Sequence, residues 1–118
     1  LEVFTHNEFP RSYAVIATVD RDGAEIQIGV ARYMPTETAG TAEFAVAVAD
    51  EWQRRGLASS LMHIVIVAAA LAGYRHLDGI ILRENTAMLG LAKKLGFGIV
   101  KGQGDGPLAV RVRKTLAA

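Results

Sequence analysis

The sequence contains no cysteine among its 118 residues, and neither sign of charge is in clear excess. Without cysteine the chain can form no disulfide framework, no thiolate metal site and no cysteine nucleophile, a composition that suits a reducing cytoplasm. The net charge is +1, and basic residues alternate with acidic ones, so no broad basic field is available for nucleic acid. We therefore expect a cytoplasmic protein that does not bind nucleic acid.

Long hydrophobic runs are also missing. The longest apolar run covers residues 64–72, which is too short to span a bilayer and lies inside a helical pattern. No charged and then apolar leader follows Leu1, so the sequence resembles a domain cut from a longer chain or one that lacks its start. Because 51% of the residues are hydrophobic, we expect one compact domain over residues 1–118, with no membrane segment.

Short segments rich in strand-forming residues alternate with turn residues and two helical patterns. The strands are predicted over residues 13–19, 25–33, 41–49, 76–82, 99–101 and 108–115, and residues 20–23, which end in Gly23, are predicted to form a hairpin turn between the first two. The first helix is predicted over residues 57–72, where the apolar positions, Leu71 among them, recur at helical spacing, and the second begins at the N-cap Asn85 and ends at Gly96. This order predicts an α/β fold in which helices flank a mixed sheet.

The segment between the third strand and the first helix is suited to holding phosphate. It runs over residues 48–59, contains Gly56 and Ala58, and carries the positive charges of Arg54 and Arg55. A helix N-terminus offers unpaired N–H groups and the positive end of the helix dipole, and small residues let a ligand approach the backbone. An ordinary strand-to-helix connection with two solvated arginines is an equally good interpretation of the residues alone.

The same segment resembles the acetyl-CoA motif of the GNAT superfamily, [RQ]-x-x-G-x-[GA], with Gln53, Gly56 and Ala58 at its defined positions. The family pattern also has an apolar strand ending in Val before the motif, then an Asn, a helix and Gly-Phe after it. Residues 44–48, Asn85 and the pair at 96–97 supply these features. The resemblance implies an N-acetyltransferase whose central sheet is mixed and mostly antiparallel.

A closer resemblance is to the Pat-type protein lysine acetyltransferases, whose domain is fused to, or acts on, bacterial acyl-CoA synthetases. Residues 42–46, 77–80 and 91–97 carry it. It implies acetyl-CoA as the cosubstrate, without a metal, and a protein lysine as the acceptor, in an acyl-CoA synthetase for instance. The alternatives are a small-molecule amine acetyltransferase and a non-catalytic domain that senses acetyl-CoA.

The resemblance also implies a set of cofactor contacts. Backbone groups of the third strand would pair with the pantetheine arm, the motif segment would hold the pyrophosphate, and an Asn would lie near the thiol end. In this sequence these residues are Val46, Ala47 and Val48 for the arm, Gln53, Arg54, Arg55, Gly56, Leu57, Ala58 and Ser59 for the motif, and Asn85. Tight packing of the alanines and simple helix capping by Asn85 are the structural alternatives.

Glu43 is a carboxylate in an apolar strand, which requires a partner or a function. In one interpretation it lies near the start of its strand and reaches solvent or a nearby arginine. In the other it is a general base, and the Pat-type enzymes carry a catalytic glutamate at the matching position.

The sequence departs from the family pattern in two ways. Many GNAT enzymes carry a tyrosine four residues before the glycine of Gly-Phe, where it reprotonates the departing thiolate, and this position is Ala92. Another group supplies the proton, or none is needed because a thiolate is a stable leaving group near neutral pH; the sequence does not assign the role to Tyr74. The family also places a strand and one or two helices before residues 13–19, and residues 1–12 hold too little pattern to replace these N-terminal elements.

Histidine and tryptophan residues have no spacing typical of a metal site, so we expect no bound metal. They are expected at packing or surface positions: His6, Trp52, His63 and His76.

Overall fold

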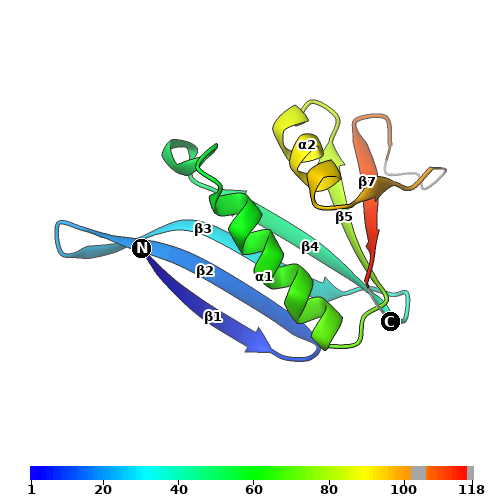
Figure 1. Ribbon diagram of the computed structural model, residues 1–118, viewed down its shortest axis with the longest axis horizontal. Helices are drawn as coiled ribbons and strands as arrows, with labels where there is room; N and C mark the ends of the chain where they lie inside the picture. Colours follow the sequence, from blue (N-terminus) through cyan, green and yellow to red (C-terminus); the bar gives the residue numbers. More distant parts are fainter. Residues whose placement is uncertain (102–105, 117–118) are drawn as a thin grey trace.

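The computed structural model describes residues 1–101 and 106–116, without the side chains of His6 and Asn7. The described chain forms a seven-stranded sheet in the order β1-β2-β3-β4-β5-β7-β6 (Figure 1). The strands are β1 (Glu2–Glu8), β2 (Ser12–Arg21), β3 (Ala24–Pro35), β4 (Thr41–Val48), β5 (His76–Leu82), β6 (Gly98–Ile99) and β7 (Ala109–Thr115). The helices are the 3-10 helix η1 (Asp50–Trp52), α1 (Leu57–Leu71) and α2 (Thr86–Lys94).

All neighbouring strands are antiparallel except β4 and β5, which are parallel. The predicted α/β fold with a mixed, mostly antiparallel sheet is therefore confirmed. The six strands and two helices predicted from residue 13 onward are all present, with ends shifted by a few residues.

The first twelve residues, which hold too little pattern for the sequence to predict an element, contain a strand. Residues 2–8 form β1, an edge strand antiparallel to β2. Its apolar residues Val3 and Phe4 are adjacent and both are exposed, so no apolar alternation announces the strand. An edge strand is held by backbone hydrogen bonds, which any sequence without proline can make.

The predicted β2–β3 hairpin has a tight turn at Asp22 and Gly23. Both residues adopt positive φ, at 55° and 80°, which is the backbone geometry that two-residue hairpin turns favour. The Gly23 N–H donates to Asp20 Oδ1 at 3.0 Å and fixes the turn.

The long helix α1 lies across β2, β3 and β4 on one face of the sheet (Figure 1). Leu61, Met62 and Val65 are almost completely buried beneath it. Gly29 of β3 permits the close approach, since a Cβ there would lie 3.0 Å from Leu61 Cδ1. Leu71, which the periodicity placed on the buried stripe, is 76% exposed because it lies in the last turn, beyond the sheet contact.

Three tyrosines anchor the β1–β2 turn against α1 and β3. Tyr33 is fully buried, stacks on Tyr13 and meets the ring of Tyr74 edge-on at 5.4 Å. The hydroxyl groups of Tyr33 and Tyr74 donate to the carbonyl oxygens of Pro10 and Arg11, at 2.9 and 2.8 Å. Burial raises the pKa of Tyr33 to about 12, so this phenol stays a hydrogen-bond donor.

Candidate active site

The strands β4 and β5 separate partway along their length (Figure 1). Their parallel pairing joins residues 41–43 to residues 76–78, ends at Glu43 and Asp78, and does not continue elsewhere in the described chain. The edge of β4 over residues 44–48 therefore faces β5 without a ladder. From Glu43 to Val48 this edge spans about 17 Å at the usual rise of a strand.

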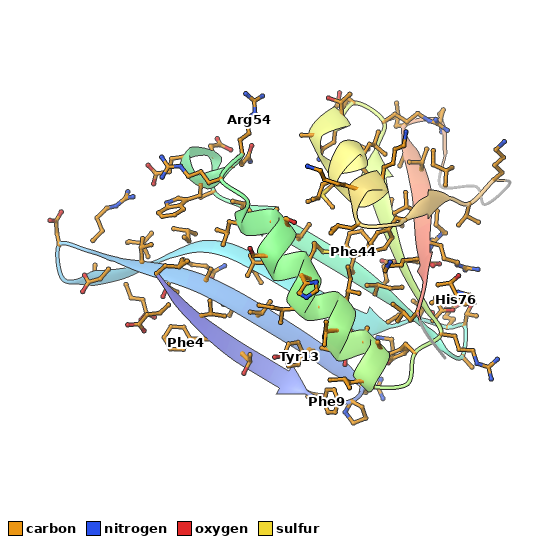
Figure 2. The ribbon with its side chains drawn as sticks, viewed as in Figure 1. Phe4, Phe9, Tyr13, Phe44, Arg54 and His76 are labelled. Carbon is orange, nitrogen blue, oxygen red and sulfur yellow. The ribbon has the colours of Figure 1, made fainter. Side chains whose placement is uncertain are left out.

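Aromatic packing holds the two strands apart on the face that α1 covers. The ring of Phe44 lies over Gly79 of β5, where even a Cβ would overlap it, and it meets Phe97 edge-on at 5.1 Å. Phe97 follows α2, so this contact joins β4 to the segment that follows α2, while Figure 2 places Phe44 between the helices. Side-chain packing replaces backbone pairing at this point of the sheet.

The strand residues expected to contact the pantetheine arm lie on this unpaired edge. Ala47 is exposed, and Val46 and Val48 are half-buried. Ala45 lies on the same side of β4 as Ala47 and is also exposed, so small side chains leave this part of the strand open to a ligand. The structure thus brings the three predicted residues to the gap in the pairing.

The edge of β4 leads directly to the N-terminus of α1. Arg54 and Gly56 both have positive φ, at 64° and 80°, and Gly56 is the N-cap residue. The first bond of the helix runs from the Ser60 N–H to the Gly56 carbonyl at 3.0 Å, so the N–H groups of residues 57–59 precede the helical ladder. No side chain of the described residues caps them. The predicted motif therefore ends in an uncapped helix N-terminus.

Two predicted motif side chains contact their own loop. The Gln53 amide donates to the Val48 carbonyl at 3.1 Å and to Asp50 Oδ1 at 3.3 Å. The Arg55 guanidinium lies over the Trp52 ring, 5.1 Å from its centroid. Figure 2 shows Arg54 projecting outward from the loop. Gln53 and Arg55 thus stabilise the turn that presents the backbone N–H groups.

Asn85 is the N-cap of α2, as predicted. Its Oδ1 accepts a hydrogen bond from the Met88 N–H at 3.1 Å, and the residue is exposed.

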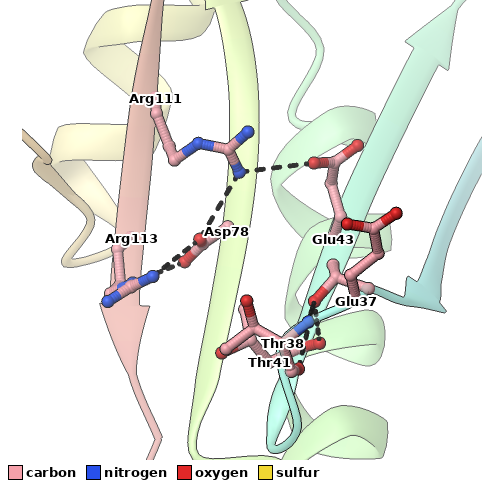
Figure 3. A pocket seen from close by; sticks show the side chains of 8 residues that line it. Glu37, Thr38, Thr41, Glu43, Asp78, Arg111 and Arg113 are labelled. Carbon is pink, nitrogen blue, oxygen red and sulfur yellow. Dashed lines mark hydrogen bonds and ion pairs between the residues drawn. The ribbon is translucent and has the colours of Figure 1, made fainter. Parts of the chain in front are cut away.

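A pocket of about 290 Å³ opens beside Glu43, at the point where β4 and β5 part (Figure 3). It lies on the sheet face opposite α1, and its lining is formed by polar and charged residues of the β3–β4 turn, β4, β5 and β7. These residues are Thr36, Glu37, Thr38, Thr41, Glu43, Asp78, Arg111 and Arg113. The arginine contact considered for Glu43 is present, because Arg111 Nη1 lies 3.5 Å from Glu43 Oε1.

Sequence reasoning missed the groups that surround Glu43. Asp78 is 2% exposed and makes a bidentate pair with Arg113, at 2.7 and 3.0 Å. The hydrogen bond that Arg113 donates to the Asp78 carboxylate raises the pKa of Arg113. Asp78 stands in an apolar strand as Glu43 does, and this was the available signal; the arginines become its neighbours only through the β5–β7 register.

Thr41 and His76 pair in register next to Glu43 and Asp78. Thr41 Oγ1 and His76 Nδ1 are both buried and have no hydrogen-bond partner among the described residues. Thr41 also lines the pocket. Thr41, beside the pocket, and His76 therefore have unused hydrogen-bonding capacity.

His63 and Trp52 are not among the residues that line this pocket. His63 is exposed on α1, and Trp52 packs at the edge of the core. The side chain of His6 lies outside the described residues. Within the described chain no group of three or more His, Asp or Glu residues is arranged to hold a metal ion. No described helix is long and apolar enough to cross a membrane.

No tyrosine lines the pocket within the described chain. Ala92 is 2% exposed, and the Tyr74 hydroxyl is engaged with the Arg11 carbonyl. Neither the position of Ala92 nor Tyr74 therefore provides a proton donor in this pocket.

A sequence model of the acetyltransferase (GNAT) family matches residues 2–97 of this chain. Acetyltransferase PA5475 of Pseudomonas aeruginosa is 34% identical over 90 residues, which cover 76% of this chain and 48% of that protein. The chain therefore belongs to the GNAT family, whose members are acyltransferases. It spans about half the length of this curated relative.

Solved structures agree with the family assignment. The GNAT domain of S. lividans PAT matches with a TM-score of 0.78 at 28% identity, over 94% of this chain and 64% of that one. The cAMP-binding acyltransferase from Mycobacterium smegmatis matches with a TM-score of 0.72 at 25% identity, over 94% and 33% of the two chains.

Proposed function

We propose that this domain transfers the acetyl group of acetyl-CoA to a primary amine, and that the amine is a lysine side chain of a protein. The observation that carries the proposal is the separation of β4 from β5. It leaves an unpaired edge of β4 that extends from Glu43 toward the N-terminus of α1. Such a site suits an elongated ligand with an anionic end and a reactive end about 17 Å apart.

In this proposal the backbone of the chain holds most of the cosubstrate. The N–H groups at residues 54–59, together with the dipole of α1, hold the pyrophosphate, as helix N-termini hold anions elsewhere. The unpaired edge over residues 46–48 pairs with the amides of the pantetheine arm. Asn85 lies at the N-terminus of α2. Capping uses its Oδ1, so its side-chain NH₂ group can donate to the cosubstrate near the thiol end.

Glu43 supplies the base that an amine acceptor requires. A lysine amine has a pKa of about 10.4, so it enters the pocket protonated and cannot attack a thioester until it loses a proton. The pocket places the Glu43 carboxylate at the end of the open strand edge, where the acetyl group would lie. Glu43 takes the proton directly or through a water. CoA leaves as a thiolate, which is stable near neutral pH, so no proton-donating tyrosine is needed at the position of Ala92.

Two features support a protein lysine as the acceptor. The pocket, at about 290 Å³, lies at the lower end of the range of about 300–1,000 Å³ that binding cavities for drug-sized molecules occupy. It accommodates an aminoalkyl group while the rest of the acceptor remains on the surface. The second feature is the sequence resemblance to Pat-type enzymes, which implies an acyl-CoA synthetase as the acceptor; the GNAT domain of S. lividans PAT is similar to this chain at 28% identity.

The test is acetyl transfer from isotope-labelled acetyl-CoA, followed by mass spectrometry. The domain is incubated with purified acyl-CoA synthetases, a general lysine-peptide library and a panel of small amines, with Glu43→Gln as the control enzyme. We expect labelled lysines that depend on Glu43. Labelling of small amines alone would favour the small-molecule alternative, and calorimetric binding of CoA without any transfer would favour acetyl-CoA sensing.

A further inference from the structure

Arg111 lies between two carboxylates at the point where the sheet opens. Glu43 and Asp78 are register partners on adjacent strands, so their like charges face each other across the last paired position of β4 and β5. Arg111 Nη1 lies 3.5 Å from Glu43 Oε1 and 3.5 Å from Asp78 Oδ2. One guanidinium thus offsets the repulsion between the two carboxylates (Figure 3).

The two carboxylates that Arg111 contacts differ in how firmly they are held. The Asp78 side chain is 3% exposed and is clamped by both nitrogens of the Arg113 fork. The Glu43 side chain is 41% exposed and borders the unpaired edge of β4. The Asp78 carboxylate is therefore fixed in position, and it holds Arg111 in turn. Arg111 then restricts the rotamer of the more exposed Glu43 side chain.

From this geometry we infer that Arg111 is a positioning residue: it holds the Glu43 carboxylate toward the pocket, where the acceptor amine delivers its proton. The inference rests on the proposed function. Both contacts of Arg111 are 3.5 Å, which is long for a charge-assisted hydrogen bond, and only the Glu43 carboxylate is exposed, so an incoming ammonium can replace Arg111 on Glu43.

The test is a double-mutant cycle of turnover at saturating acetyl-CoA. Arg111→Met should lower kcat about 10- to 100-fold, the range expected when a reacting group is misplaced, with the CoA affinity unchanged. Arg32→Met is the matched control, since Arg32 is exposed on the same face of the neighbouring strand β3 and its removal costs the same charge. Arg32→Met should leave kcat within about twofold of the wild type, a much smaller change than that expected when a reacting group is misplaced.

The decisive variant is the double substitution of Arg111→Met with Glu43→Gln. If Arg111 acts through Glu43, the double variant should be about as slow as Glu43→Gln alone, because coupled residues are not additive. Multiplied losses would overturn the inference, as would wild-type turnover by Arg111→Met while Glu43→Gln is slow. Wild-type turnover by Glu43→Gln would instead remove the proposed base, and the inference with it.

Calorimetric CoA binding confirms that each variant is folded. Should Arg111→Met fail to fold, the cycle uses Arg111→Lys, which keeps the positive charge but lacks the planar guanidinium whose Nη1 contacts both carboxylates. The same non-additivity is expected, and its absence would overturn the inference.

Discussion

Substitution of Gly56 tests where the phosphates of CoA bind. Gly56 has φ of 80°, a conformation that costs other residues about 1–2 kcal/mol, and a Cβ there would meet no atom within 4 Å. Gly56→Glu should therefore fold, with the melting temperature lowered by about 4–8 °C for a domain of this size. The new carboxylate would lie at the uncapped helix N-terminus, where the proposal places the pyrophosphate.

The expected loss of affinity follows from Coulomb's law. Two like charges about 5 Å apart at an effective dielectric constant of about 20 repel by about 3 kcal/mol, which is about 100-fold or more in the dissociation constant. Gly56→Ala incurs the same backbone strain without the charge, so its CoA affinity should fall less than about tenfold, as expected without the repulsion. Isothermal titration with CoA measures both.

Gly73 provides a matched control for the backbone strain. It has φ of 92°, a Cβ there would meet nothing within 4 Å, and it follows the opposite end of α1. Gly73→Glu should lower stability as Gly56→Glu does and leave CoA affinity unchanged. If Gly56→Glu binds CoA as the wild type does, or if both variants lose binding equally, the phosphates do not bind at the N-terminus of α1.

Three further substitutions test the fold around the site. Burial raises the pKa of Tyr33 from 10.0 to about 12, so it stabilises the folded state fully below pH 10 and this contribution is lost as the pH rises to 12; urea unfolding of Tyr33→Phe should show a shallower decline over that interval, and an unchanged decline would contradict the assignment. Asn85→Ala should lower the free energy of unfolding by about 1 kcal/mol through loss of the cap, and unaltered stability would exclude a capping role. Gly79→Ala should cost about 1–3 kcal/mol because its methyl group overlaps Phe44, whereas Gly90→Ala, with open space in α2, should be neutral or stabilising; equal melting temperatures for the two would refute this packing.

The fold was predictable wherever the sequence carries a local pattern. The helical spacing from Leu57 onward, the cap at Asn85 and the turn at Gly23 each depend on residues close in sequence, and all three are present. The strand β1 has no such pattern, because its pairing uses backbone groups and its apolar residues are exposed. The exposure of Leu71 shows a related limit, since periodicity identifies a face but not where the partner surface ends.

The candidate site was predictable only in part, for the same reason. Glu43 is visible in the sequence because a lone carboxylate in an apolar strand is unusual, and the motif at residues 53–58 is contiguous. Its partner Arg111 is 68 residues away, and the contact exists only because β7 pairs with β5 in one particular register. Asp78 contacts both Arg111 and Arg113 through the same register.

The most direct test of the central claim is the turnover of Glu43→Gln as a function of pH, with a lysine acceptor that the wild type modifies. Glutamine keeps the size and hydrogen-bonding shape of the side chain and removes its basicity. The account predicts a fall in kcat of about 10²- to 10⁴-fold near neutral pH, partial recovery at higher pH where free amine forms unaided, and unchanged CoA affinity. A kcat within about threefold of the wild type near neutral pH would contradict the account, because the loss of a general base lowers kcat much further.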